Sequence, residues 1–140
     1  MLSIPSAHSL LITDGRETSS RHSLKEVHSL LAESDLLVYS ICILDRIQLT
    51  GKAGAHVQNT LNRLSDVTGG RAFYPENVSQ MDEVFDQIAL ELRHQYSIGY
   101  KPQDFTSDGQ WHRLKIKVEP PKGYSHLVVR SRDGYFASPK

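Results

Sequence analysis

Short apolar runs and amphipathic stripes alternate through the first two-thirds of the chain. The apolar runs cover residues 10–13, 36–44 and 72–74, and the second is apolar nearly throughout, as in a strand covered on both faces. Elsewhere, apolar residues recur every three or four positions, which is the spacing of one face of a helix. These helical stripes cover residues 24–33, 57–67 and 81–92. The resulting β-α-β-α-β-α order predicts an α/β fold with a parallel sheet and crossover helices.

Local signals indicate where two of these helices begin or end. Ser23 and Glu26 have the Ser-x-x-Glu spacing of a capping box, in which a hydroxyl and a carboxylate satisfy free amides at a helix start. Gly69 and Gly70 follow the second stripe and suit the left-handed cap at a helix end. Residues 51–55, which contain two glycines, are predicted to form a loop before that second helix.

The pattern changes after His94 to an alternation with a period of two. Residues 96–100 and 114–118 alternate apolar and polar side chains, which predicts strands with one solvated face and hence antiparallel pairing. A further strand is expected at residues 126–130, followed by a turn at Asp133-Gly134. We therefore predict an α/β part over residues 1–101 and a small antiparallel β extension over residues 102–140, packed on the same domain.

Composition and charge narrow the classes of partner. The 140 residues fit one domain, and Lys+Arg and Asp+Glu both total 16, so no net field favours nucleic acid or an anionic membrane. Arg113, Lys115 and Lys117 alternate along one predicted strand, which is typical of a solvated strand face. No segment approaches the ~18 apolar residues of a membrane span, and the amino end lacks the pattern of a signal peptide. We expect neither a nucleic-acid partner nor membrane insertion.

The motifs of common enzymes are missing from the sequence. It contains no Gly-x-Ser-x-Gly, no His-Glu-x-x-His and no glycine-rich phosphate-binding loop, so we predict that the chain is not an enzyme. Its single cysteine, Cys42, lies within an apolar run and is expected to be a small buried hydrophobe.

Asp14 is the most informative candidate residue. The apolar run 10–13 stops at Asp14-Gly15, and ligands collect just beyond the carboxyl ends of strands in open α/β sheets. Hydroxyls follow at Thr18, Ser19 and Ser20, and carboxylate and hydroxyl oxygens suit Mg²⁺. The alternative is that Asp14 only starts a turn with Gly15 and caps local amides.

Several segments together resemble the carboxyl-terminal part of a von Willebrand factor A (VWA) domain, most closely the VWA-related proteins of Acidobacteria. The similarity spans roughly residues 8 to 137. The segments that carry it are Leu-Leu-Ile-Thr-Asp-Gly at 10–15, Leu-Ser-Asp-Val-Thr-Gly-Gly-Arg-Ala-Phe-Tyr at 64–74, Glu-Leu-Arg-His-Gln-Tyr-Ser-Ile-Gly-Tyr at 91–100 and Val-Arg-Ser-Arg-Asp-Gly-Tyr-Phe at 129–136. The resemblance implies a doubly wound, Rossmann-like sheet of which residues 1–101 are the carboxyl half. It also implies a non-enzymatic protein-interaction or adhesion module from an extracytoplasmic (periplasmic or secreted) parent.

The resemblance also implies an incomplete metal site of the MIDAS type. The family's site uses an Asp-x-Ser-x-Ser loop, a threonine from a later loop and an aspartate at the end of the fourth strand. Asp14 matches only that last position, and the chain contains no Asp-x-Ser-x-Ser. We therefore expect Mg²⁺ in the intact parent and none bound by this chain alone, with Gly15, Thr18, Ser19 and Ser20 shaping the ligand loop.

The resemblance gives this chain no counterpart to the segment that carries the family's first three strands. In the family's sheet, the first of those strands lies beside the strand that here ends at Asp14. An open sheet edge is therefore expected, and it would favour a homodimer or an amino-terminal complement. Two alternatives to a protein-binding module remain: a structural or assembly fragment that pairs through this edge, and a metal-dependent hydrolase fragment in which Asp14 binds the metal.

Overall fold

The computed structural model describes residues 7–14, 21–43, 51–96, 98–100, 102, 107–124 and 127–137. These residues form a mixed α/β structure with a three-stranded parallel sheet and a separate two-stranded antiparallel sheet. In chain order the elements are β1 (Ala7–Thr13), α1 (Leu24–Glu33), β2 (Leu36–Cys42), α3 (Lys52–Asp66), β3 (Arg71–Phe73), the 3₁₀ turn η1 (Val78–Gln80), α4 (Met81–Arg93), β4 (Trp111–Arg113) and β5 (Gly134–Phe136). The predicted alternation of strands and helices is confirmed.

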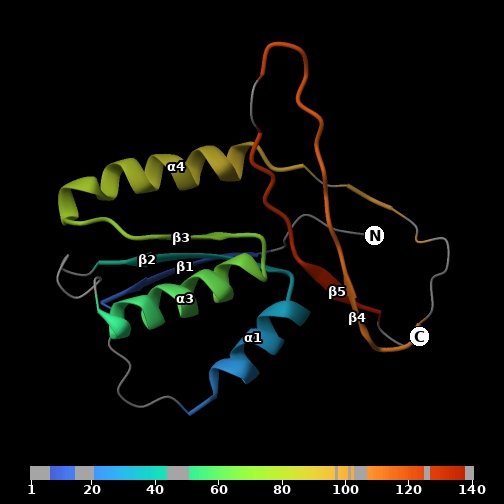
Figure 1. Ribbon diagram of the computed structural model, residues 1–140, viewed down its shortest axis with the longest axis horizontal. Helices are drawn as coiled ribbons and strands as arrows, with labels where there is room; N and C mark the ends of the chain where they lie inside the picture. The colour runs from blue at the N-terminus through green and yellow to red at the C-terminus, as the bar shows by residue number, and fades with distance from the viewer. Residues whose placement is uncertain are drawn as a thin grey trace.

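The parallel sheet has the order β1-β2-β3, so β2 is central and β1 lies at one edge. β2 pairs along its full length with β1, with Leu10 opposite Tyr39 and Ile12 opposite Ile41. Figure 1 shows α4 over one face of this sheet and α3 and α1 on the other side. The central strand is buried at every position after Leu36, which explains its nearly continuous apolar sequence.

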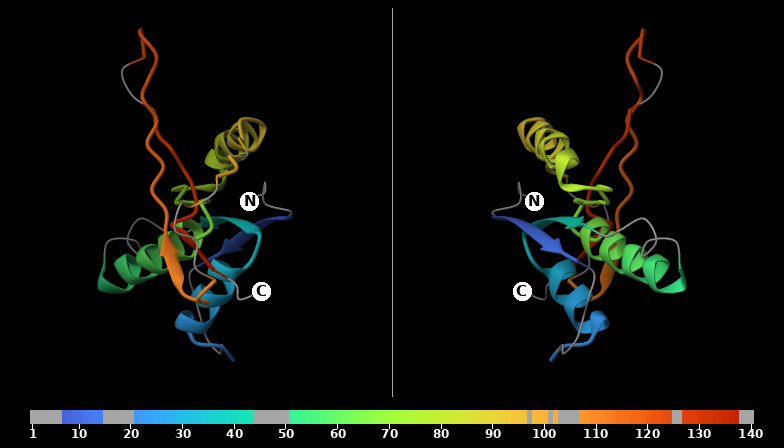
Figure 2. Two further views of the ribbon diagram at one scale, coloured as in Figure 1. Left: turned by 90° about the vertical axis from the view of Figure 1, so that its right-hand side faces the viewer. Right: turned by 90° about the vertical axis from the view of Figure 1, so that its left-hand side faces the viewer.

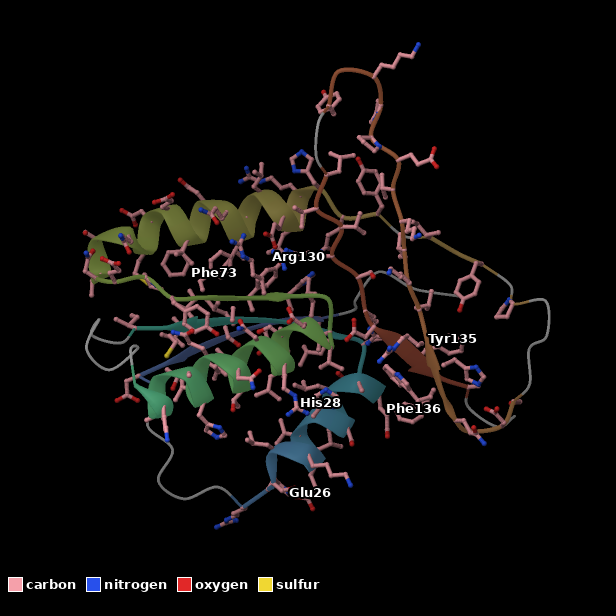
Figure 3. All side chains as sticks on the ribbon, in the orientation of Figure 1. Glu26, His28, Phe73, Arg130, Tyr135 and Phe136 are labelled. Atoms are coloured by element: carbon pink, nitrogen blue, oxygen red, sulfur yellow. The ribbon has the colours of Figure 1, made fainter. Side chains whose placement is uncertain are left out.

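The two faces of β2 pack against different helices. Leu37, Tyr39 and Ile41 form one buried cluster with Phe73 of β3 and with Val84 and Ile88 of α4. Figure 3 shows the labelled Phe73 side chain in the layer between β3 and α4. On the other face, Cys42 packs with Leu61 of α3. The sheet is therefore covered on both faces at its centre.

The start of α1 follows the sequence prediction closely. The Ser23 Oγ accepts from the Glu26 amide at 3.3 Å, and the Glu26 carboxylate accepts from the Ser23 amide at 2.7 Å. These bonds lower the pKa of the exposed Glu26 carboxyl, the backbone bond from Ser23 being the largest cause. The capping box is therefore present as predicted.

The start of α3 corrects the sequence prediction. Residues 51–55 do not form a loop, because α3 begins at Lys52 with Gly51 as its N-cap. Glycine is an acceptable N-cap, and the alanines at positions 53 and 55 are the strongest helix formers, so the glycines do not prevent the helix from starting.

A buried polar network joins the end of α3 to β2. The Thr68 Oγ1 accepts from the Val38 amide at 3.0 Å and donates to the Ser65 carbonyl at 2.7 Å. The hydroxyls of Ser65 and Ser40 lie 2.9 Å apart. Gly69 then turns the chain with φ of +83°, which confirms the predicted left-handed cap. The network fixes β2 against α3 with its buried polar groups paired.

The carboxyl-terminal region has fewer strands than predicted. β4 and β5 pair antiparallel, so an antiparallel extension is present, but the described residues within 96–100, 114–118 and 126–130 are not in strands. Between β4 and β5 the chain makes a long projection that we call the arm, with an outgoing limb (114–124) and a returning limb (127–133). Figures 1 and 2 show both limbs running side by side away from the sheet and helices.

Side-chain charge explains why the paired strands end at Arg113. The β4–β5 register places Arg113 opposite Gly134, and the Leu114 amide still donates to the Asp133 carbonyl at 2.8 Å. Continuing this register would set Lys115 opposite Arg132 and Lys117 opposite Arg130. Like charges directly opposite each other destabilise an antiparallel pair. The alternation of residues 114–118 therefore does not lead to a longer ladder.

Candidate functional site

Asp14 lies where the sequence places it, directly after β1 at the carboxyl end of the parallel sheet. The last residue of β1, Thr13, pairs with Cys42 of β2, and its carbonyl accepts from the Ile43 amide at 3.1 Å. The Asp14 residue is exposed. It is close enough to Cys42 that its negative charge, after burial itself, raises the pKa of the Cys42 thiol.

The surroundings of Asp14 do not supply a Mg²⁺ shell from the described residues. The thiol of Cys42, with its raised pKa, is a protonated soft group, whereas Mg²⁺ prefers oxygen ligands in an octahedron. No group of three or more His, Cys, Asp or Glu side chains in the described ranges could hold a metal ion. The predicted ligand-loop residues Gly15, Thr18, Ser19 and Ser20 lie outside the described residues.

The most unusual surface is the outer side of β1. Leu10, Leu11 and Ile12 are 45%, 40% and 53% exposed, although they belong to an apolar strand of an α/β sheet. Paired residues of a parallel sheet share a face, so Leu10 and Ile12 lie on the α4 side and Leu11 lies on the α3 side. The helices cover β2 on both faces but do not cover β1. Figure 2 shows β1 at the outer margin of the sheet.

The outer edge of β1 also lacks the features that usually block strand addition. No strand among the described residues pairs along it. The seven residues of β1 include no Lys, no Asp, no Glu and no Pro, and His8 is their only ionisable side chain. Natural edge strands are commonly short, bulged or charged, which prevents pairing with other chains. This strand therefore combines an open edge with apolar side chains on both faces.

A polar cluster that sequence reasoning missed holds the base of the arm. The Tyr39 hydroxyl donates to the Glu91 carboxylate at 3.1 Å, and burial followed by the Glu91 charge raises the pKa of Tyr39. The same carboxylate forms ion pairs with Arg71 at 3.4 Å and with Arg130 at 3.7 Å. Figure 3 shows the labelled Arg130 on the returning limb near the end of α4. No sequence signal links these residues, because β2, β3, α4 and the arm each supply one.

The returning limb makes two further contacts with the α/β part. The Arg132 guanidinium donates to the Asp35 carboxylate at 3.1 Å. A Cβ on Gly69 would lie only 3.0 Å from the Arg132 amide nitrogen, so the limb passes directly over that glycine. The arm is therefore attached to the body through its returning limb.

Aromatic side chains fill the space around β4 and β5. The rings of Trp111 and Phe136 meet edge to face with centroids 5.0 Å apart, and the His112 ring stacks on Tyr135 at 5.5 Å. The Asp108 carboxylate lies 3.0 Å from the His112 Nε2, and this bond is the main cause of the lowered pKa of Asp108. These contacts stabilise the two-stranded sheet.

A scan of the sequence against protein-family models finds no match, and searches of curated proteins and of solved structures find none either. No helix within the described ranges is long and apolar enough to cross a membrane.

Proposed function

We propose that this chain is a non-enzymatic protein-interaction module that adds a strand of a protein partner to the edge of β1. The observation that carries the proposal is the exposure of Leu10, Leu11 and Ile12 on both faces of β1, whose outer edge pairs with no strand of the described residues. Strand addition gives affinity through main-chain hydrogen bonds and specificity through alternate side chains. Large exposed apolar surfaces of this kind mark sites of protein contact.

The two-sided exposure defines the chemistry of the partner. A strand that only paired with the edge would satisfy the backbone but leave Leu11 on one face and Ile12 on the other partly in water. Full burial of such a side chain is worth about 1.5–3 kcal/mol, and roughly half of that surface is still exposed here. We therefore propose a partner strand that is uncharged, apolar on both faces and part of a folded unit. A second copy of this chain and a separate amino-terminal complement both fit that description.

The resemblance to a VWA domain supports the same proposal. Residues 1–101 would be the carboxyl half of a doubly wound sheet, and the partner strand would occupy the position beside β1. The parallel order β1-β2-β3 and the helices on both faces agree with such a half-sheet. By the same analogy we propose an extracytoplasmic parent protein.

A charged residue on β1 is expected to abolish association through this edge. Leu11→Lys places a flexible cation in the middle of the strand, which is how natural edge strands resist pairing. Light scattering should show the mass of the wild-type chain rising with protein concentration and the mass of the variant staying at that of the monomer. Leu30→Lys is the matched control, since Leu30 is also exposed but lies on α1. A wild-type chain that is a stable monomer at every concentration would contradict a self-pairing edge.

Asp14 supports a second candidate function, in which the intact domain holds Mg²⁺ at this edge of the sheet. The supporting observation is its exposed carboxylate beside the carboxyl end of β2. Since no group of three or more His, Cys, Asp or Glu side chains in the described part of the chain could hold a metal ion, we expect calorimetry with Mn²⁺ or Mg²⁺ to show no saturable binding by this chain alone. Loss of partner binding in Asp14→Ala with the fold intact would favour the metal, and unchanged binding would favour the edge. Saturable binding that Asp14→Ala removes would show instead that the chain is self-sufficient.

A further inference from the structure

The arm carries a concentration of positive charge in a chain whose total charge is zero. Residues 113–124 include four cations and one anion, Glu119. The cations are all exposed: Arg113, Lys115, Lys117 and Lys122. Three of them alternate in sequence, so they repeat at intervals of about 6.6–6.8 Å along an extended chain. This row of Arg113, Lys115 and Lys117, which we call the cation row, lies on β4 and the outgoing limb.

Two acidic residues of the α/β part pair with the returning limb of the arm. Arg130 pairs with Glu91 of α4, and Arg132 pairs with Asp35 just before β2. Among the described residues, no carboxylate forms a salt bridge with any member of the cation row. The returning limb is thus held by the α/β part. The cation row is exposed, and no carboxylate of the described residues forms a salt bridge with it.

The backbone of the outgoing limb is available for pairing in the part that precedes Pro120 and Pro121, which have no amide to donate. Beyond the bond from the Leu114 amide to the Asp133 carbonyl, no backbone hydrogen bonds join the described parts of the two limbs. Figures 1 and 2 show the limbs as drawn-out segments that project away from the rest of the structure. Unsatisfied amides and carbonyls in an extended segment can accept an added strand.

Apolar side chains accompany the cations along the arm. Val118 on the outgoing limb and Leu127, Val128 and Val129 on the returning limb are all exposed. Exposed aliphatic side chains next to unpaired cations suit a ligand that has carboxylates and apolar groups in alternation. A phosphate backbone would leave these aliphatic groups uncovered. The aromatic rings at β4 and β5 are already engaged, Trp111 with Phe136 and Tyr135 with His112, so Tyr124 near the far end of the outgoing limb is its one exposed ring.

We propose that the cation row and the outgoing limb form a docking strand for an acidic extended segment of a partner protein. Alternate Asp or Glu side chains of that segment pair with Arg113, Lys115 and Lys117, since both strands share the same two-residue repeat. The apolar side chains that alternate with these carboxylates in the partner segment contact Val118 and the other exposed aliphatic side chains of the arm. This surface is distinct from β1, whose partner is uncharged, so it gives the module a second specificity.

The test is fluorescence anisotropy with a labelled peptide of about eight residues in which glutamate and valine alternate. We expect saturable binding that weakens with added salt, because the charges are exposed. Lys115→Glu with Lys117→Glu is expected to weaken binding by about tenfold or more, since two attractive pairs become repulsive. The matched control is Lys25→Glu with Lys52→Glu, which makes the same charge change on α1 and α3. Circular dichroism checks that both double variants are folded.

Four outcomes would overturn the proposal. The wild-type chain could fail to bind the peptide, could bind an alternating lysine–valine peptide equally well, or could be unaffected by the arm substitutions. A labelled single-stranded oligonucleotide could also bind more tightly than the acidic peptide, which would make the arm a nucleic-acid surface. Leu11→Lys on β1 should leave peptide binding unchanged, so this experiment and the test of the β1 edge can fail independently.

Discussion

Replacing Gly70 with alanine is expected to unfold the α/β part of the chain under conditions in which the wild type is stable. A Cβ at this position would lie 1.9 Å from the Val38 carbonyl oxygen and 2.8 Å from its carbon. Val38 cannot easily move away, because its amide donates to the buried Thr68 hydroxyl at 3.0 Å. We expect a loss of about 3 kcal/mol or more in the free energy of unfolding, measured by denaturant titration.

Gly51→Ala is the matched control for this prediction. No described atom lies within 4 Å of a Cβ built on Gly51, which is the N-cap of α3. Alanine is a poorer N-cap than glycine, so a loss of about 1 kcal/mol or less is expected. Gly70 is not among the glycines with positive φ, so alanine causes no backbone strain at this position. The loss of unfolding free energy in Gly70→Ala therefore measures the close approach of position 70 to β2. Equal losses in the two variants would show that β2 does not constrain position 70.

The neighbouring glycines Gly69 and Gly70 illustrate how far the sequence could predict the fold. The cap at Gly69 and the box at Ser23 and Glu26 depend on neighbours within a few residues, and both were predicted. The contact between Gly70 and Val38 joins residues that are distant in the chain, and no local pattern reports it. The helical period and the apolar runs therefore predicted the order of the helices and strands. They did not predict the close contact between Gly70, just before β3, and Val38 of β2.

The arm shows the opposite case, in which a correct pattern led to an incorrect element. Residues 114–118 do alternate apolar and polar side chains, yet they do not pair as a strand. Pairing depends on register, and the register of β4 and β5 would oppose Lys115 to Arg132. At the base of the arm Gly134 lies directly against the Trp111 ring, since a Cβ there would come within 2.7 Å of it. Ion pairs hold Arg130 and Arg132 to the α/β part.

The candidate site was predictable in part. Asp14 follows an apolar run, and its place at the carboxyl end of β1 needs only the rule for parallel sheets. The open edge that the resemblance to a VWA domain implies stays a prediction, while β1 is an edge strand of the sheet that the described residues form. Exposure of Leu11 on one face and of Ile12 on the other could not be inferred from residues alone, because it depends on how far α3 and α4 extend across the sheet.

Replacing Ile41 with alanine is expected to cost about 2–5 kcal/mol of unfolding free energy. Ile41 is fully buried in the cluster between β2, β3 and α4, where few neighbouring groups can move into the space that the smaller side chain leaves. Denaturant titration of the variant, with the wild type measured at the same protein concentration, gives this loss. A loss below about 1 kcal/mol would contradict the packing of this cluster.

Ile12→Ala is the control that turns this stability measurement into a test of function. Ile12 pairs with Ile41 in register and lies on the same face of the sheet, but it is 53% exposed. In an isolated monomer its replacement should cost about 1 kcal/mol or less. If β1 binds a second copy of the chain, the loss should grow with protein concentration, because a partner that binds only the folded state stabilises it by mass action. A loss equal to that of Ile41→Ala at the lowest concentration would mean that the monomer itself covers β1, and the edge would then not be open for a partner.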